Sequence, residues 1–292
     1  MYRTALAAVA AAAAGSADAQ MVLGVNNLAS LVSGTAGDTL IQFDFSNPGA
    51  FVGPGLDLVT PTGAPLSGIG GLDFDAGGTL FASDAFGPNP GEIFRVDPAT
   101  GISTSLGSVG AAINDLAWDP VTGDMYGVGG ASGNELFANV DDPANAVSLG
   151  TFPAIAGGLD VGLAFDSQGN IHVHDLTNDA IYAGAGADTS VSLLHSLPFD
   201  SNFSQGLFVD WSRDDQGYHA ALNGTTVSSE NYFFGSLATG DPYGPFVGAF
   251  GIDAASGLPF VEVGDLTIVP IPAPAAFSLL TIAGLGATRR RG

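Results

Sequence analysis

The sequence predicts an all-β chain: a β-propeller of five four-stranded blades, preceded by a signal peptide and followed by a C-terminal transmembrane helix. Three observations lead to this prediction: a repeated five-residue unit, a composition rich in turn residues, and two terminal segments that differ in composition from the rest. The 43 glycines and 17 prolines, with few Lys, Glu and Arg, indicate many turns and few helices. The predicted ectodomain spans residues 20–268.

Residues 1–19 have the order of a secretory signal peptide. Arg3 supplies a positive start, residues 5–14 are apolar, and Ala17-Asp18-Ala19 matches a small-residue cleavage site before Gln20. We therefore expect the first nineteen residues to act as an export signal and to take no part in the fold.

A five-residue unit recurs from residue 71 onward. Its leucine falls at positions 72, 116, 163 and 207, in steps of 44, 47 and 44. Each copy precedes a tight turn that ends in glycine, then an alternating strand, a third strand and a weaker fourth. Repeats of this length with several strands are typical of propeller blades. A β-sandwich or an irregular solenoid is the alternative, because the chain has neither a WD nor a Kelch signature.

The segment before residue 71 fits the same unit without its first strand. Residues 28–32, 39–44 and 51–59 would supply strands two, three and four. We expect the missing strand to come from the other end of the chain, from residues 246–252 or 260–263, and to close a ring of five units. Six units are the alternative if residues 246–268 hold more than a closing strand. The last strand should end near Val269, because Pro270 has no amide to donate to a sheet.

The last 24 residues, 269–292, form a separate segment. Val269-Pro270-Ile271-Pro272-Ala273 leads into a run without charged side chains that ends at Thr288, and Arg289, Arg290 and Arg291 follow. An apolar run closed by arginines is typical of a membrane span with a cytoplasmic C-terminus, and this run lies at the short end of the roughly 20 residues that a span needs. An ordinary membrane anchor and a buried core helix are the alternatives.

This order of a Pro-x-Pro box, an apolar helix and a basic cluster resembles the PEP-CTERM sorting signal of Gram-negative bacteria. Ile271 in place of Glu makes it more similar to the VPLPA-CTERM variant. The resemblance implies that an exosortase-type membrane protease recognises the signal formed by Pro270, Pro272 and the three arginines. Cleavage near the box would then release a transiently inner-membrane-anchored ectodomain to the cell surface or the extracellular matrix. The repeat also loosely resembles the propeller-like bodies of surface proteins of this class.

The charge of the ectodomain excludes one class of function. Of six basic residues only Arg95 and Arg213 lie between the two terminal signals, against all but one of the 29 acidic residues. Such a surface repels nucleic acids and anionic lipids, so a nucleic-acid role is excluded. Solubility is one interpretation of the acidity, and binding of divalent cations or polycations is the other. The absence of cysteine excludes disulfides, thiolate metal sites and a cysteine nucleophile.

Two sets of residues are candidates for metal binding. His172 and His174 point to one face of a predicted strand and Asp175 follows, which suits a metal site; the alternative is strand residues that face a wet channel or the surface. Aspartates also recur at equivalent positions of the units. They either hold Ca²⁺ near the propeller axis or accept hydrogen bonds from their own turns. These aspartates are Asp73, Asp75, Asp119, Asp166 and Asp210.

The sequence contains no nucleophile elbow, no zinc-protease motif and no phosphate-binding loop. We therefore expect an exported, non-catalytic binding or structural protein of the cell surface or matrix, with no catalytic residues and no cofactor. Trp118 and Trp211 are expected in the core, with a sugar-stacking platform as the alternative. A Ca²⁺-dependent propeller hydrolase or lactonase, with acids lining an axial channel, and a polysaccharide-binding adhesin are the alternative functions.

Overall fold

The structure is a computed structural model, and it describes residues 21–27, 37–44, 47–52, 55–155, 157–197, 205–210, 216–222, 230–236, 248–249 and 263–269. Several predicted segments lie outside the described residues: the signal peptide, the strand at residues 28–32, and the sorting segment from Pro270 onward. Among the described residues there is no helix with the length and apolar character needed to cross a membrane.

Four of the antiparallel sheets have four strands each, in chain order from the inside to the outside of the molecule. The first contains β5 (Ile69–Phe74), β6 (Leu80–Asp84), β7 (Glu92–Val96) and β8 (Ser103–Ser108). The second contains β9 (Ile113–Trp118), β10 (Met125–Gly129), β11 (Glu135–Ala138) and β12 (Val147–Thr151). The third contains β13 (Asp160–Phe165), β14 (Ile171–Asp175), β15 (Ala180–Gly184) and β16 (Ser192–Ser196). The fourth contains β17 (Gln205–Asp210), β18 (Gln216–Leu222), β19 (Glu230–Ser236) and β20 (Gly248–Ala249). Two short 3₁₀ turns, η2 (Pro143–Asn145) and η3 (Pro153–Ile155), flank β12.

A further sheet joins the two ends of the described chain. Its order is β21 (Val263–Ile268), β1 (Met21–Asn26), β2 (Thr39–Asp44) and β3 (Asn47–Phe51), and β4 (Leu56–Asp57) also pairs with β2. β21 and β1 are antiparallel, with Val22 opposite Ile268. The closing strand therefore comes from the C-terminal side, as expected, but it is residues 263–268 and neither of the two segments proposed from the sequence. The strand ends at Ile268, and the Val269 amide makes one more bond, of 2.9 Å, to the Met21 carbonyl.

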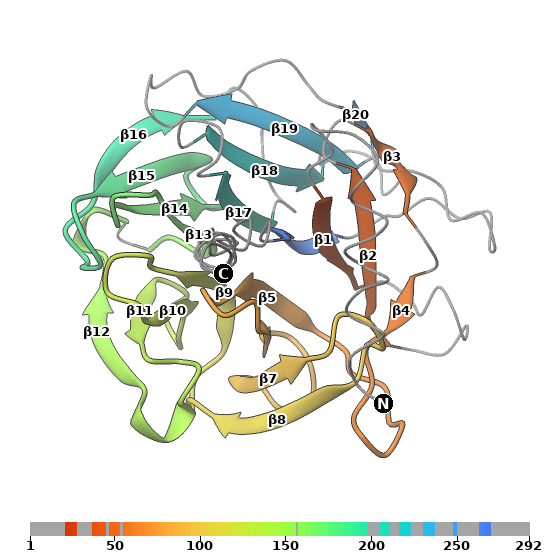
Figure 1. Cartoon of the computed structure of the whole chain (residues 1–292). Helices are drawn as coiled ribbons and strands as arrows, with labels where there is room; N and C mark the ends of the chain where they lie inside the picture. Colours follow the sequence, from red (N-terminus) through yellow and green to blue (C-terminus); the bar gives the residue numbers. More distant parts are fainter. Residues whose placement is uncertain are drawn as a thin grey trace, which may run out of the picture.

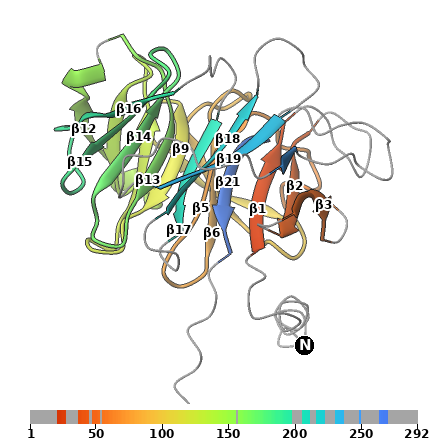
Figure 2. The same ribbon diagram turned by 90° about the horizontal axis from the view of Figure 1, so that it is seen from above.

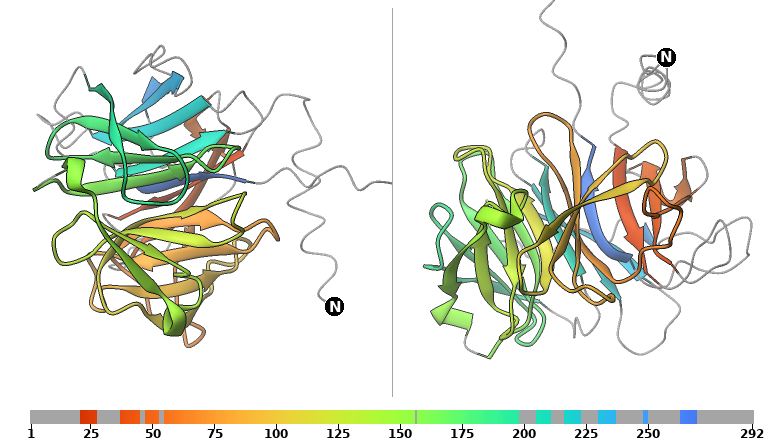
Figure 3. Two further views of the ribbon diagram at one scale, coloured as in Figure 1. Left: turned by 90° about the vertical axis from the view of Figure 1, so that its left-hand side faces the viewer. Right: turned by 90° about the horizontal axis from the view of Figure 1, so that it is seen from below.

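The sheets are arranged around a common centre (Figure 1). Successive innermost strands contact each other in the order β5, β9, β13, β17 and β21, and β21 also contacts β5. β8, β12 and β16 lie at the rim (Figure 1). Figures 2 and 3 show the same arrangement from its sides, with the sheets tilted against one another. The prediction of an all-β, propeller-like arrangement of four-stranded sheets is thus confirmed.

The hairpin between the first two strands of a sheet explains why the repeat is visible in the sequence. Gly78, Gly123 and Gly169 take φ values of 79°, 77° and 77°, which glycine adopts without a steric penalty. The amides of Gly78 and Gly169 each donate a 3.0 Å bond to the carbonyl of the aspartate that opens the turn, Asp75 or Asp166. The aspartate and the glycine recur because each hairpin needs both.

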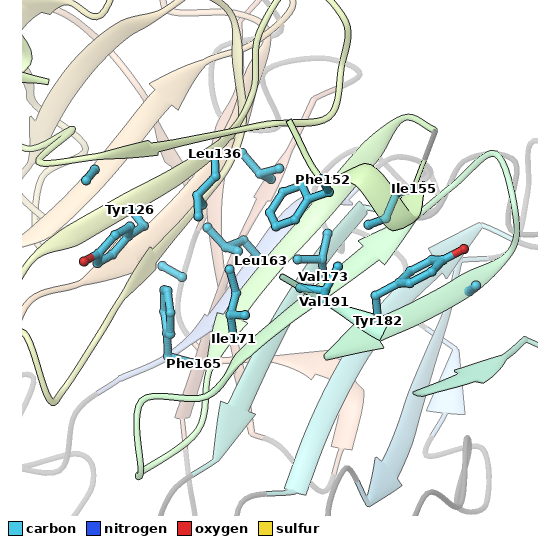
Figure 4. Close-up of a cluster of buried hydrophobic side chains, with 14 residues drawn as sticks. Tyr126, Leu136, Phe152, Ile155, Leu163, Phe165, Ile171, Val173, Tyr182 and Val191 are labelled. Carbon is cyan, nitrogen blue, oxygen red and sulfur yellow. The ribbon is translucent and has the colours of Figure 1, made fainter. Parts of the chain in front are cut away.

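The apolar core lies between successive sheets. In the largest cluster, side chains of the β9–β12 sheet meet those of the β13–β16 sheet (Figure 4). Phe152 and Ile155 lie above Leu163 and Val173 there, and all four are fully buried. A second cluster joins the closing sheet to the β5–β8 sheet, and a third joins that sheet to β9–β12. The β5–β8 and β9–β12 sheets are therefore covered by apolar neighbours on both faces, which explains why β5 and β9 are buried along nearly their whole length.

Candidate functional site

The residues singled out on β14 lie at its two ends. His172 lies near the hairpin from β13, where its Nε2 is 3.7 Å from Asp166 Oδ2, an ion-pair distance. Asp175 lies at the opposite end, where it accepts bonds of 3.0 Å from the amides of Leu159 and Thr177 and one from the Asn178 side chain. His174 is fully buried between them. The structure thus brings His172 to Asp166 and not to Asp175. Within the described ranges, no three or more His, Asp or Glu side chains are grouped so that they could hold a metal ion.

The aspartates that open the hairpins accept hydrogen bonds from their own turns. Asp75 Oδ1 accepts from the Thr79 amide at 2.7 Å, and Asp119 accepts from the Val121 amide and the Thr122 hydroxyl, both at 2.8 Å. Asp166 accepts from the Gln168 amide and from the amide and side chain of Asn170. Burial alone would raise the pKa of Asp166, but these bonds and the contact with His172 together lower it to about 2. These side chains act locally, on the turns that they open.

A different set of carboxylates links one sheet to the next near the centre of the molecule. Asp265 on β21 accepts from the Leu72 amide of β5. Asp73 on β5 accepts from the Trp118 amide of β9 at 2.8 Å and from the Thr267 hydroxyl of β21 at 2.6 Å. Asp115 on β9 accepts from the Leu163 amide of β13 at 2.6 Å. Each bond fixes the offset between neighbouring innermost strands.

Two of these carboxyl groups also contact each other. Asp115 and Asp265 form a side-chain hydrogen bond, and both are fully buried. Burial is the main reason that the pKa of each lies well above the usual range, and the negative charges of Asp73 on Asp115 and of Asp115 on Asp265 add to it. The pKa of Asp73 rises to about 6, because burial outweighs its hydrogen bonds from Thr267, Trp118 and Phe74.

Asp160, the first residue of β13, is the second unusual acid. It is fully buried, and neither of its carboxyl oxygens has a hydrogen-bond partner. It lies directly opposite Asp175 in the sheet. Burial, and next the charge of Asp175, raise its pKa to about 8. With a pKa of about 8, Asp160 is mainly the neutral carboxylic acid at pH 7, and the Asp175 carboxyl group opposite it favours this form.

Sequence reasoning missed Asp115, Asp160 and Asp265, although a signal for two of them was present. Asp115 and Asp265 directly precede the leucine of their unit, where the other units have Gly71, Gly162 and Gly206. The glycines leave little room: a Cβ on Gly206 would lie 2.4 Å from Asp265 Oδ1. Among the aspartates singled out from the repeat, Asp73 differs from the turn aspartates Asp75, Asp119 and Asp166, because it accepts hydrogen bonds from two neighbouring innermost strands.

Other predicted residues are placed only in part. Trp118 packs against the core cluster between the β5–β8 and β9–β12 sheets, in agreement with a core role. Trp211 and the side chain of Asp210 lie outside the described part of the chain, as do Pro270, Pro272 and the three C-terminal arginines.

Comparison with protein-family models and with curated proteins gives no match. Among solved structures, the chain is similar to one described as the crystal structure of the nidogen/laminin complex, with a TM-score of 0.53 and 12% sequence identity. The similarity covers 86% of this chain and 98% of the other. At this identity the similarity concerns the fold alone, and it agrees with the propeller-like arrangement of the sheets.

Proposed function

We propose that this chain is an exported β-propeller of five blades that serves as a non-catalytic binding or structural protein at the cell surface or in the extracellular matrix. The observation that carries the proposal is the use of the central carboxylates. Asp73, Asp115 and Asp265 direct their oxygens to backbone amides of neighbouring strands or to each other. Acids that hold the blades together in this way are unsuited to polarise a substrate in an axial channel.

The closed order of contacts among the innermost strands supports a count of five blades. One solved structure similar to this chain is that of a nidogen/laminin complex, which is compatible with a binding role for this architecture. A Ca²⁺-dependent hydrolase would instead need several carboxylate and carbonyl oxygens turned toward one point, because Ca²⁺ takes six to eight oxygen ligands.

Metal analysis distinguishes the binding protein from the hydrolase. The purified ectodomain is dialysed against a chelator, reloaded with Ca²⁺ and measured by mass spectrometry of the metal, with Asp115→Asn as the variant and Asp75→Asn as the matched control. We expect no stoichiometric Ca²⁺ in any of the three proteins. One Ca²⁺ per chain that is lost only in Asp115→Asn would contradict the proposal and support the enzyme.

We further propose that an exosortase-type protease processes the C-terminal segment. The support is the residue order from Pro270 to Arg291 and the end of the last strand at Ile268, which leaves the Pro box directly after the fold. The full chain is expressed in a host with an exosortase, and the membrane and released fractions are compared. We expect wild type to be shortened and released, whereas a variant with Pro270 and Pro272 replaced by Ala stays full-length in the membrane. Equal processing of both would refute the sorting proposal.

For the ectodomain we propose a neutral polysaccharide as ligand. The rim strand β8 carries the exposed hydroxyl side chains Thr104, Ser105 and Ser108, and a strongly acidic surface repels anionic polymers. Hydroxyl and carboxylate groups can form hydrogen bonds with the hydroxyl groups of neutral sugars. A glycan array tests this proposal: binding to neutral glycans is expected, and binding confined to anionic glycans would contradict it.

A further inference from the structure

The hydrogen-bonded pair Asp115–Asp265 connects two innermost strands that are not neighbours in the ring. Asp265 lies on β21 and Asp115 on β9, and β5 lies between these strands in the order of contacts. Asp265 also accepts from the amide of Leu72 on β5, and Asp115 accepts from the amide of Leu163 on β13. Through this pair the closing strand is tied to three other innermost strands, in addition to its ladder with β1.

A hydrogen bond between two carboxyl groups requires a proton on one of them. The remaining oxygens are occupied: Asp115 Oδ1 accepts from the Leu116 amide and Asp265 Oδ1 from the Leu266 amide, both at 2.7 Å. With one proton the pair carries a single negative charge surrounded by amide donors. Without it, two carboxylates face each other in a fully buried position, where like charges repel strongly.

The groups around the pair do not neutralise this charge. From β5 the titratable group is Asp73, and Asp75 acts on Asp73 in turn. β13 contributes the Leu163 amide, and the backbone of β17 approaches Asp265 at Gly206. Among the described residues the one arginine, Arg95, lies on the third strand of its sheet with its side chain exposed.

We propose that the Asp115–Asp265 pair is a proton-dependent latch that holds the closing strand β21 in the ring. When the pair loses its proton, β21 is the strand that separates. β9 and β10 are consecutive strands joined by a hairpin, whereas β21 and β1 come from opposite ends of the chain and pair through their ladder. Release of β21 therefore opens the ring without unfolding any hairpin.

Hydrogen exchange of the full chain between pH 5 and pH 8 tests the latch. Exchange rates are corrected for their intrinsic pH dependence and expressed as opening equilibrium constants for β21, with β7 as an internal control. Because opening releases the shared proton, the opening constant of β21 should rise about tenfold per pH unit for as long as the closed pair keeps that proton. At pH 8 the opening constant of β21 should exceed that of β7, because the latch releases β21 without unfolding the β5–β8 sheet.

Asp265→Asn is the informative variant, because its amide donates to Asp115 at every pH. In this variant the opening constant of β21 should lose the tenfold rise per pH unit that release of the shared proton causes in wild type. Asp75→Asn, which alters a turn carboxylate at the end of β5, should keep the wild-type slope. If Asp265→Asn does not fold, Asp115→Asn removes the same shared proton and takes its place. Equal opening constants for β21 and β7 in wild type at pH 8, or an unchanged slope in the Asn variant that folds, would refute the latch.

Discussion

Replacement of Asp160 by Val should stabilise the protein at neutral pH. Asp160 begins β13, whereas β5, β9 and β21 begin with Ile69, Ile113 and Val263. Its side chain is fully buried, and neither carboxyl oxygen has a hydrogen-bond partner. Such a group costs free energy in either protonation state, because water would satisfy it in the unfolded chain.

The raised pKa of Asp160 sets the size of the effect. In the folded protein the pKa is about 8, against an ordinary value of 3.8. Because folding raises this pKa, the fold is more stable below pH 4 than at neutral pH, and the difference is lost as the pH rises toward 8. One pKa unit corresponds to roughly 1.4 kcal/mol, so about 4 kcal/mol is lost between pH 4 and pH 7. The valine variant does not titrate, so its advantage over wild type should grow by about this amount over the same interval.

Urea denaturation at pH 4, 5.5 and 7, followed by tryptophan fluorescence, measures this growth. Asp160→Asn is the matched control: it also does not titrate but keeps a buried polar group, so it should show the same pH dependence with a lower stability than the valine variant. A difference in unfolding free energy between Asp160→Val and wild type that stays constant from pH 4 to pH 7 would refute the reasoning. Asp160 would then carry the same charge in the folded and the unfolded protein at each pH.

Three further changes test other parts of the structure by the same denaturation measurement. Gly71→Ala would place a Cβ 2.7 Å from the Leu116 amide nitrogen, and we expect a loss of about 1–3 kcal/mol. Gly77→Ala would place a Cβ 3.2 Å from Asp75 Oδ1, the end of a side chain and not backbone, and should change stability by less than about 0.5 kcal/mol. Phe152→Ala removes a fully buried ring between two sheets and should cost about 3–5 kcal/mol; a cost below about 1 kcal/mol would contradict the packing. The pKa of Asp166 is lowered to about 2, so its ionised form stabilises the fold above pH 4, and this contribution is lost as the pH falls toward 2. In Asp166→Asn the free energy of unfolding should therefore fall less between pH 4 and pH 2 than in wild type. An equal fall in both proteins would exclude this role.

The hairpins could be predicted from the sequence because their determinants are local. An aspartate, a glycine with positive φ and an alternating strand lie within about ten residues of one another, and the structure has a hairpin where these signals occur in the first three complete units. The end of the last strand could also be predicted, because proline cannot donate to a ladder. The second strand of the closing sheet, β1, was not predicted, because Met21–Asn26 carries no repeat signal.

The sequence predicted which residue types matter at the candidate site, but not which of these residues contact one another. The sequence indicated that aspartates matter at the start of the hairpins, and Asp75, Asp119 and Asp166 do accept bonds from their turns. It also placed His172, His174 and Asp175 together, because they are close in the chain. On an extended strand of roughly 3.3 Å per residue, His172 and Asp175 are about 10 Å apart. His172 contacts Asp166 at one end of β14, and Asp175 accepts from the Leu159 amide at the other.

By itself the sequence determined the fold class, the repeating hairpin and the acidic, cysteine-free character of the chain, because these depend on local turn chemistry, strand periodicity and composition. The tertiary structure alone decided which strand closes the ring and which carboxyl groups meet at its centre. The Leu72 amide and the Asp265 carboxylate are 193 positions apart in the chain. A contact over that distance depends on the angle at which each sheet packs on the next, and no local pattern contains that angle.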